Sequence, residues 1–281
     1  MNLKNLLTRA GTGIIYILVI LIGILCGRYS FLVVFGITLV ISLFEFYRMM
    51  EKDTSHDISK IFNILSGLFI YVAAFLYLEQ ISQKAFPLVC IIYFLVLIVS
   101  SIAIRREDIF HSIIYSVFGQ IYITLSLCVL MLFSYSFSHE TGTITGYNKT
   151  PILALFVFLW VNDTAAYFIG SLIGKHKLME HISPKKSTEG FFAGIFFTLI
   201  ASLIFARTHP EFSILFWLGF ALIVSVVGTL GDLFESLLKR TCNVKDAGNL
   251  IPGHGGILDR IDSLLIATPA VYLYLILTLS L

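Results

Sequence analysis

The sequence predicts an all-α fold, a polytopic membrane bundle of about nine transmembrane helices with its N-terminus in the cytoplasm. Of its 281 residues, 58% are hydrophobic and only 13% are charged, whereas soluble chains carry about 25% charged residues. The apolar residues gather in runs of about 20, the length that a helix needs to cross a bilayer. Lys and Arg concentrate in alternate connecting segments. We expect residues 1–281 to form a single integral membrane domain.

The first apolar segment, Gly11–Gly27, follows Lys4 and Arg9 as the core of a secretory signal would. No small-residue cleavage site comes after it, and the apolar pattern resumes directly beyond Arg28, so we expect an uncleaved span that forms a tight hairpin with the next one. The other spans are expected at Ser30–Tyr47, Ile61–Leu78, Ala85–Ile104, Ile113–Tyr135, Ile152–Ile173, Phe191–Ala206, Ile214–Leu233 and Ser263–Leu281.

The distribution of basic residues predicts the orientation. With nine spans, fifteen of the 19 Lys and Arg residues fall on the side of the N-terminus. Short cytoplasmic loops carry this excess of basic residues. The polar segments that follow the sixth and eighth spans should therefore face the cytoplasm. The basic residues on the other side are Arg28, Lys84, Lys149 and Arg207.

Charge and cysteine content exclude several classes of protein. The net charge is +2 with no basic stripe, which does not indicate a nucleic-acid-binding protein. The four cysteines include no CxxC pair, and Cys26, Cys90 and Cys128 lie inside apolar runs. We expect small buried side chains rather than disulfides or a zinc site.

The longest polar stretch, residues 231–263, is the candidate catalytic loop. Carboxylates bind hard divalent cations through oxygen, Lys and Arg neutralise phosphate oxygens, and glycines let backbone amides approach an anion. This mixture indicates phosphate chemistry, whereas an ordinary solvated loop would not need it. The ionisable residues are Asp232, Glu235, Lys239, Arg240, Lys245, Asp246, His254, Asp259, Arg260 and Asp262.

The spacing within this stretch resembles the signature of the phosphatidate cytidylyltransferase, or CDP-diacylglycerol synthase, family of bacterial type. The match runs through Ser236, Lys239-Arg240, Lys245-Asp246, Gly248, Ile251-Pro252, His254-Gly255-Gly256, Asp259-Arg260 and Asp262. The resemblance implies transfer of CMP from CTP to phosphatidic acid, which releases pyrophosphate and supplies phospholipid biosynthesis. It also implies Mg²⁺, an all-helical fold in the bacterial inner membrane in contact with membrane lipids, and an active site facing the cytoplasm. A second cation and a homodimer stay open.

The resemblance also implies roles for individual residues. Asp232 and Asp259 are expected to bind the metal, with Asp262 and Asp246 as weaker candidates for the same role. His254 is expected to donate to a phosphate oxygen or to hold the turn formed by Gly255 and Gly256. A phosphomonoester has a second pKa near 6 and is largely ionised at pH 7, so the site needs neutralisation and alignment more than a general base. Phosphate contacts are expected from Lys239, Arg240, Lys245 and Arg260.

Two further features lie outside the signature. Asn162-Asp163 stands in the middle of the sixth span, where a carboxylate costs roughly 2.5 kcal/mol or more; Asp163 either packs against a neighbouring helix or lines the substrate cavity. The segment Ser183-Pro184-Lys185-Lys186-Ser187 is either a topology signal or a site for the CTP phosphates. Its continuation to Glu189-Gly190 is similar to an element of the same family.

Two other functions compete with this interpretation. A polytopic transporter would account for Asp163 but not for carboxylates and cations gathered in one loop. A CTP-using lipid kinase would transfer the γ-phosphate and leave CDP instead of pyrophosphate. The D-G-x2-A-R motif of CDP-alcohol phosphotransferases is absent from the sequence.

Overall fold

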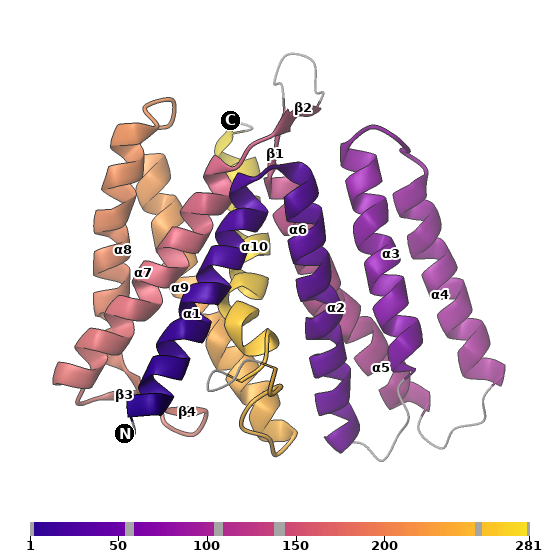
Figure 1. Ribbon diagram of the computed structural model, residues 1–281, viewed down its shortest axis with the longest axis horizontal. Coiled ribbons are helices and arrows are strands. Elements are labelled where there is room, and N and C mark those ends of the chain that lie inside the picture. Colours follow the sequence, from indigo (N-terminus) through magenta and orange to yellow (C-terminus); the bar gives the residue numbers. More distant parts are fainter. Residues whose placement is uncertain (1–2, 54–58, 104–108, 138–143, 251–254, 280–281) are drawn as a thin grey trace. The chain divides into compact units, whose positions relative to one another are not determined.

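The computed structural model describes the backbone of residues 3–53, 59–103, 109–137, 144–250 and 255–279. Side chains are described from residue 11 onward within these ranges, except at 52, 53, 103, 136, 137, 144, 145 and 279. Each predicted span coincides with helix over most of its described residues, so the predicted all-α class is confirmed (Figure 1). Within the described ranges, eight helical segments are long and apolar enough to cross a membrane, and the first helix adds a shorter apolar stretch, Gly11–Leu25.

The backbone divides into two compact units. Unit 1 comprises Met1–Lys149 and Thr241–Arg260, and unit 2 comprises Thr150–Arg240 and Ile261–Leu281. Unit 1 contains α1 Leu3–Leu25, α2 Arg28–Asp53, α3 Lys60–Leu78, α4 Ala85–Ala103, α5 Ile109–Gly119, the π-helix η1 Gln120–Leu125, α6 Ser126–Phe133, β1 Tyr135–Phe137 and β2 Ile144–Tyr147. Unit 2 contains α7 Thr150–Ile173, β3 Lys177–Met179, β4 Ser183–Ser187 and α8 Thr188–Thr208, and most of α9 Ile214–Thr241 and α10 Leu258–Leu279.

Helix α2 is central to the core of unit 1 and packs against α1, α3 and α5. Phe35, Leu39, Leu43 and Phe46 recur every three or four residues, so they form one stripe, and all four are fully buried. The opposite face carries exposed apolar residues such as Ile37. A helix that is apolar all round suits a bilayer, where the outward face meets lipid.

A buried polar network joins α2, α3 and α5 near the end of α2 that leads to Asp53. Tyr47 donates to the carbonyl oxygen of Ser116 at 2.9 Å, Asn63 Nδ2 donates to Ser116 Oγ at 2.9 Å, and Gln120 Nε2 donates to the carbonyl oxygen of Asn63 at 2.7 Å. Gln120 opens η1, so the fifth span is not the uninterrupted α-helix that hydropathy suggests. Polar groups without access to water need partners inside the protein, and this network provides them.

The other end of α2 is held by a different set of contacts. Arg28 Nη1 lies 2.8 Å from Glu79 Oε2, and the Tyr135 hydroxyl donates to Glu79 Oε1 at 2.6 Å. Burial, together with this hydrogen bond, raises the pKa of Tyr135. Tyr147 donates to the carbonyl oxygen of Ile24 at 2.8 Å. The β1–β2 hairpin is therefore anchored where α1, α2 and α3 meet.

In unit 2, α7 lies along α8 (Figure 1). The close approach depends on Gly194, because a Cβ atom there would come within 2.6 Å of Asn162 Oδ1. Gly231 likewise allows α9 to approach α10 closely, since a Cβ atom there would lie 2.8 Å from the carbonyl oxygen of Asp262. These glycines bring the polar residues of α7, α9 and α10 close to neighbouring helices.

One expectation about the polar segments is wrong in detail. Helix α9 continues beyond Leu233 to Thr241 and α10 begins at Leu258, so much of the expected loop is helical. A helix leaving the membrane can stay helical in water, and Lys239 and Arg240 in the last turn of α9 favour this because they complement the helix dipole. The basic segment after the sixth span contains the β3–β4 hairpin.

Candidate active site

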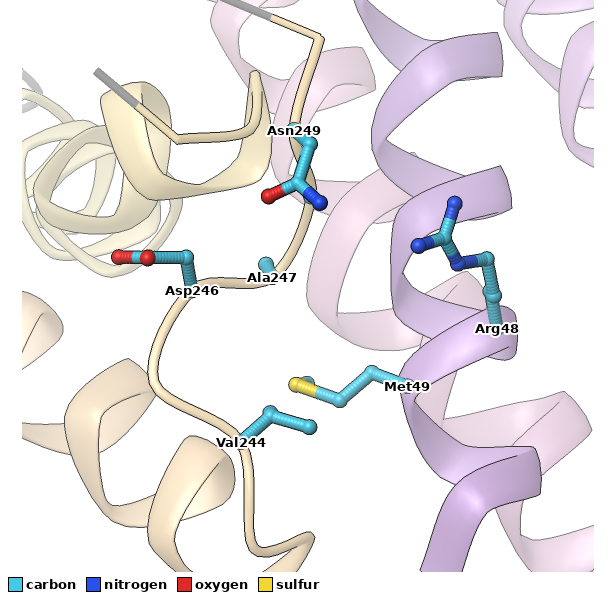
Figure 2. Close-up of a pocket in the computed structure, with 7 residues that line it drawn as sticks. Arg48, Met49, Val244, Asp246, Ala247 and Asn249 are labelled. Carbon is cyan, nitrogen blue, oxygen red and sulfur yellow. The ribbon is translucent and has the colours of Figure 1, made fainter. Parts of the chain in front are cut away.

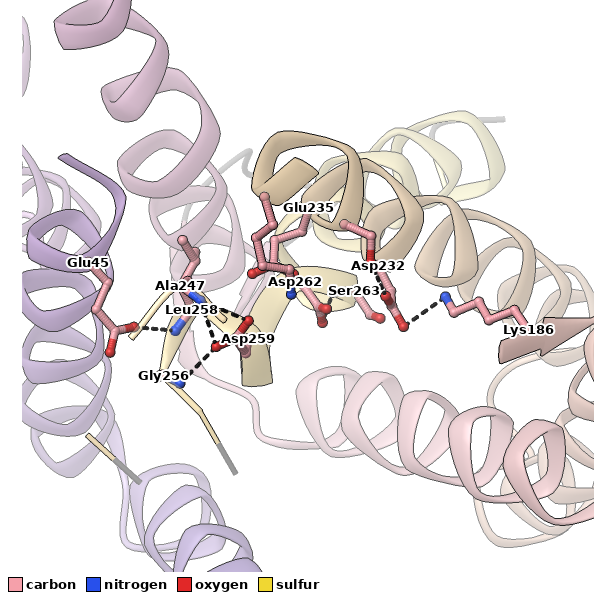
Figure 3. Close-up of polar contacts among 12 residues, drawn as sticks. Glu45, Lys186, Asp232, Glu235, Ala247, Gly256, Leu258, Asp259, Asp262 and Ser263 are labelled. Atoms are coloured by element: carbon pink, nitrogen blue, oxygen red, sulfur yellow. Dashed lines mark hydrogen bonds and ion pairs between the residues drawn. The ribbon is translucent and has the colours of Figure 1, made fainter. Parts of the chain in front are cut away.

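Asp259 organises the segment between α9 and α10. We call residues 242–257 the signature loop; 242–250 and 255–257 are described. The Asp259 carboxylate accepts hydrogen bonds from Ala247 N, at 3.2 and 3.1 Å from its two oxygens, and from Gly256 N at 2.7 Å (Figure 3). Gly255 has a φ of +86°, a conformation that glycine adopts readily. An acidic side chain in the first turn of α10 thus fixes both described parts of the loop.

A second carboxylate holds the loop from outside the signature. Glu45 of α2 is only 4% exposed, and its Oε2 accepts a hydrogen bond from Leu258 N at 2.8 Å (Figure 3). The sequence analysis assigned no role to Glu45 because it lies inside an apolar span. Its position was itself a signal, since an ionisable residue within a span is costly and marks a site of interest.

A small pocket lies between α2 and the signature loop (Figure 2). The Arg48 side chain is exposed and forms no ion pair with a described carboxylate, and the Asp246 carboxylate points away from it. Arg48 is one of the fifteen basic residues that predict the orientation, and no other role was expected of it. The pocket is lined by Arg48, Met49, Val244, Asp246, Ala247, Gly248 and Asn249.

In unit 2, Asp232 is paired with the basic hairpin. Lys186 Nζ of β4 lies 2.7 Å from Asp232 Oδ2, and Ser236 donates to Asp232 Oδ1 at 3.3 Å. The Asp232 and Lys186 side chains are 34% and 25% exposed. The structure therefore joins a predicted metal ligand to a predicted phosphate contact (Figure 3).

Other acidic side chains lie around Asp232. Glu235, one turn further along α9, is fully buried and forms an ion pair with Lys239. Asp262 interacts electrostatically with the carboxylates of Asp232, Glu235 and Asp163. Its Oδ1 accepts a hydrogen bond from Ser263 N at 2.6 Å. Glu235 was not assigned a role from the sequence, although its spacing of four residues from Lys239 is typical of helical ion pairs. Carboxylates this close repel unless cations offset their charge.

Asn162 and Asp163 are neighbours in the middle of α7 but differ in exposure. Asn162 is 2% exposed, and its Nδ2 donates to Thr229 Oγ1 at 3.4 Å and to Asp163 Oδ1 at 3.5 Å. Asp163 is exposed. Asn162 is therefore the member of this pair that packs against α9, and both roles expected of Asp163 remain predictions.

Comparison with known proteins shows the family to which the chain belongs. The model of the cytidylyltransferase family matches residues 7–278. The chain belongs to this family. It is similar to the phosphatidate cytidylyltransferase of Bacillus subtilis (strain 168), with 33% identity over 95% of this chain and 96% of the relative. The protein of that name from Staphylococcus aureus (strain COL) is 35% identical over 95% of this chain and 98% of its own. A third, from Staphylococcus saprophyticus, is 46% identical over 44% of this chain and 48% of its own.

This cytidylyltransferase-family chain divides its expected metal ligands between the two units. Asp259 belongs to unit 1 and Asp232 and Asp262 to unit 2. Among the described residues, no three Asp, Glu, His or Cys side chains are grouped so that they could hold a metal ion by themselves. Mg²⁺ usually takes one or two protein carboxylates together with substrate phosphates and water. The acidic side chains around Asp232, one of which already carries a Lys ammonium, fit a cation of that kind.

Most of the remaining predicted residues that the structure describes are exposed or partly exposed. Lys185 of β4, Arg240 at the end of α9, Lys245 and Asp246 of the signature loop, and Arg260 of α10 are exposed; Ser183 is partly exposed. Gly256 is buried against Glu45, and His254 lies outside the described residues. Exposed cations beside a lipid-facing bundle are suited to binding anionic substrates from water and from the membrane surface.

Proposed function

We propose that this chain transfers CMP from CTP to phosphatidic acid, forming CDP-diacylglycerol and pyrophosphate for phospholipid biosynthesis. The observation that carries the proposal is the family match over residues 7–278, joined by relatives of known name that align over 95% of the chain. The phosphatidate phosphomonoester is largely dianionic at neutral pH, because its second pKa is about 6. One of its oxygens attacks the α-phosphorus of CTP, and pyrophosphate leaves.

The chain's own residues then have to neutralise and align anions. Lys186 and Lys239 are already placed beside carboxylates, and Arg240, Lys245 and Arg260 are exposed and accessible to phosphate oxygens. Positioning and charge stabilisation account for most of the catalysis in transfer of phosphate groups. No side chain is required as a general base, because the nucleophile is ionised before it binds.

We further propose that Asp232 and Asp259 bind Mg²⁺, with Asp262 as an additional carboxylate. The acidic side chains around Asp232, and the Lys186 ammonium that Asp232 already carries, support a cation beside Asp232 and Asp262 in unit 2. A bound magnesium ion offsets negative charge on the phosphates of CTP and on the departing pyrophosphate. Both carboxylates are the kind of oxygen ligand that Mg²⁺ takes from proteins.

The proposed location is the inner membrane of a bacterial cell, with the active site on the cytoplasmic face. The apolar helices and the bacterial relatives support a membrane protein, and the bias of basic residues supports the orientation. A single cysteine at position 241 in a cysteine-free variant should react with an impermeant reagent only from the cytoplasmic side. Labelling from the opposite side would overturn the orientation. A homodimer remains a prediction.

The reaction is tested with purified protein in mixed micelles containing phosphatidic acid, Mg²⁺ and each of the four nucleoside triphosphates. We expect pyrophosphate release that requires both phosphatidic acid and CTP, and an Asp232→Asn variant prepared in the same way is the control for contaminating enzymes. Release of CDP in place of pyrophosphate would indicate a lipid kinase. Absence of any lipid-dependent turnover in folded protein would refute the proposal.

A further inference from the structure

We propose that Glu45 is a positioning residue for CMP transfer, which holds the signature loop and the first turn of α10 in their working conformation. The proposal rests on the function proposed above and assigns a role to a residue far from the signature in sequence. Glu45 belongs to α2, which the sequence analysis treated only as a membrane span. It lies in unit 1 with the loop that it contacts.

The first support is the hydrogen bond to the start of α10. Leu258 is the first residue of α10, and its N–H is one of the four at a helix N-terminus that lack a partner within the helix. Glu45 Oε2 accepts this N–H at 2.8 Å. A carboxylate also complements the positive end of the helix dipole. Glu45 therefore caps α10 from a helix distant in sequence, much as a local capping residue would.

The second support comes from two glycines of the signature loop that pack against the same carboxylate. A Cβ atom on Gly248 would lie 2.0 Å from Glu45 Oε1, and one on Gly256 would lie 2.4 Å from Glu45 Oε2. No side chain fits at either position unless the loop or Glu45 moves. The loop thus approaches Glu45 closely on both sides of its undescribed residues, which explains the need for glycine at 248 and 256 in physical terms.

What Glu45 positions is the part of the molecule that carries predicted site residues. Asp259 follows Leu258 directly, and its carboxylate accepts the N–H groups of Ala247 and Gly256 from the same loop. Arg260 and Asp262 lie on the same first turns of α10. A shift of α10's first residue would therefore move a proposed metal ligand and a proposed phosphate contact together. Displacements of about 1 Å can cost about 100-fold in rate.

Glu45 itself is too enclosed to contact substrate. It is 4% exposed and covered by Gly248 and Gly256, so it acts through the loop rather than on CTP. A merely structural role would lower the amount of folded protein and leave each folded molecule fully active. A positioning role lowers turnover per folded molecule and loosens the loop specifically. The two roles can be separated by experiment.

The test compares Glu45→Gln with Glu79→Gln in the purified protein. Glu79 is a matched control, because it is a nearly buried carboxylate of the same unit that accepts a hydrogen bond from Tyr135 at the other end of α2. The measurements are kcat and KM for CTP per folded molecule, and hydrogen exchange of the backbone amides in residues 244–250 and 255–260. Exchange is measured without substrates, so it tests the loop even if the proposed reaction is wrong.

We expect Glu45→Gln to lower kcat on the order of 10-fold, because a neutral amide oxygen accepts the Leu258 N–H more weakly than a carboxylate does, and to speed exchange at Leu258. Glu79→Gln should leave both kcat and the exchange rate at Leu258 unchanged. Gly248→Ala provides a second route, because its methyl group displaces the loop while Glu45 stays in place; it should also lower kcat. Wild-type kcat and exchange in folded Glu45→Gln or Gly248→Ala, or equal effects of Glu45→Gln and Glu79→Gln, would overturn the proposal.

Discussion

Asp259 and Asp232 are predicted to share one role, yet their surroundings differ. Asp259 accepts hydrogen bonds from backbone amides at positions 247 and 256, so its partners belong to the fold of unit 1. Asp232 in unit 2 carries the side-chain ammonium of Lys186, in a pair that is partly open to solvent. The backbone contacts orient Asp259 before any ligand binds, whereas Asp232 has a partner that can be exchanged. Loss of either proposed metal ligand should therefore have different consequences.

The largest expected effect is the loss of turnover when either carboxylate is neutralised. Asp232→Asn and Asp259→Asn each keep the volume of the side chain and remove one negative charge. We expect each to lower kcat by about 100-fold or more, as for the loss of a principal electrostatic stabiliser. Pyrophosphate release per folded molecule measures it. Wild-type rates and unchanged magnesium dependence in both variants would place the metal on other residues.

A smaller loss is expected at Asp163 in unit 2. Its exposed carboxylate adds negative charge near Asp262, so Asp163→Asn should weaken the attraction for a cation and lower activity about 10-fold or more at limiting Mg²⁺. Asn162 packs α7 against α8 and is left intact. Activity is compared with the wild type across a range of magnesium concentrations, and full activity of the folded variant at every concentration would exclude a role in the cavity.

Lys186 should affect metal and nucleotide in opposite directions. Removing its charge in Lys186→Gln eliminates a competitor for Asp232, so Mg²⁺ should bind about two- to fivefold more tightly in the absence of CTP, the range for a partly exposed ion pair. The KM for CTP should rise, because a cation for its phosphates is lost. Calorimetric titration with Mg²⁺ and initial rates give the two quantities.

Lys185→Gln is the matched control for this prediction. Lys185 is a neighbour in β4, is exposed, and forms no ion pair with a described residue. It removes the same charge from the same hairpin without releasing Asp232. If both variants change magnesium affinity equally, the effect comes from the overall charge of the hairpin and the comparison between Asp232 and Asp259 loses its basis.

Hydropathy predicted the spans because membrane helices must be apolar along their length. It placed the end of the eighth span at Leu233, because the run of apolar residues ends there. The backbone of α9 nevertheless stays helical to Thr241. The family resemblance pointed to Asp232 and Asp259 but could not reveal that Lys186 contacts the first. The role of Glu45 could not be predicted, because its partner Leu258 is 213 residues away along the chain. Pairings between segments so distant depend on tertiary packing, which local patterns do not encode.

An effect on stability separates the two carboxylates most directly. In Asp259→Asn, one carboxylate oxygen is replaced by an amide nitrogen that cannot accept the N–H of Ala247 or Gly256, and hydrogen bonds to a charged acceptor contribute about 1.5–3 kcal/mol. The melting temperature should fall by a few degrees without Mg²⁺. Asp232→Asn loses only a partly exposed ion pair, worth about 1 kcal/mol or less, so its melting temperature should stay near that of the wild type.

Because a ligand stabilises only the state that binds it, added Mg²⁺ should raise the melting temperature of the wild type more than that of either variant. Thermal unfolding in detergent, with and without Mg²⁺, measures both contrasts. If the two variants lose equal stability without metal, the backbone contacts of Asp259 contribute no more than the Lys186 pair, and the distinction between a fixed and an exchangeable carboxylate fails.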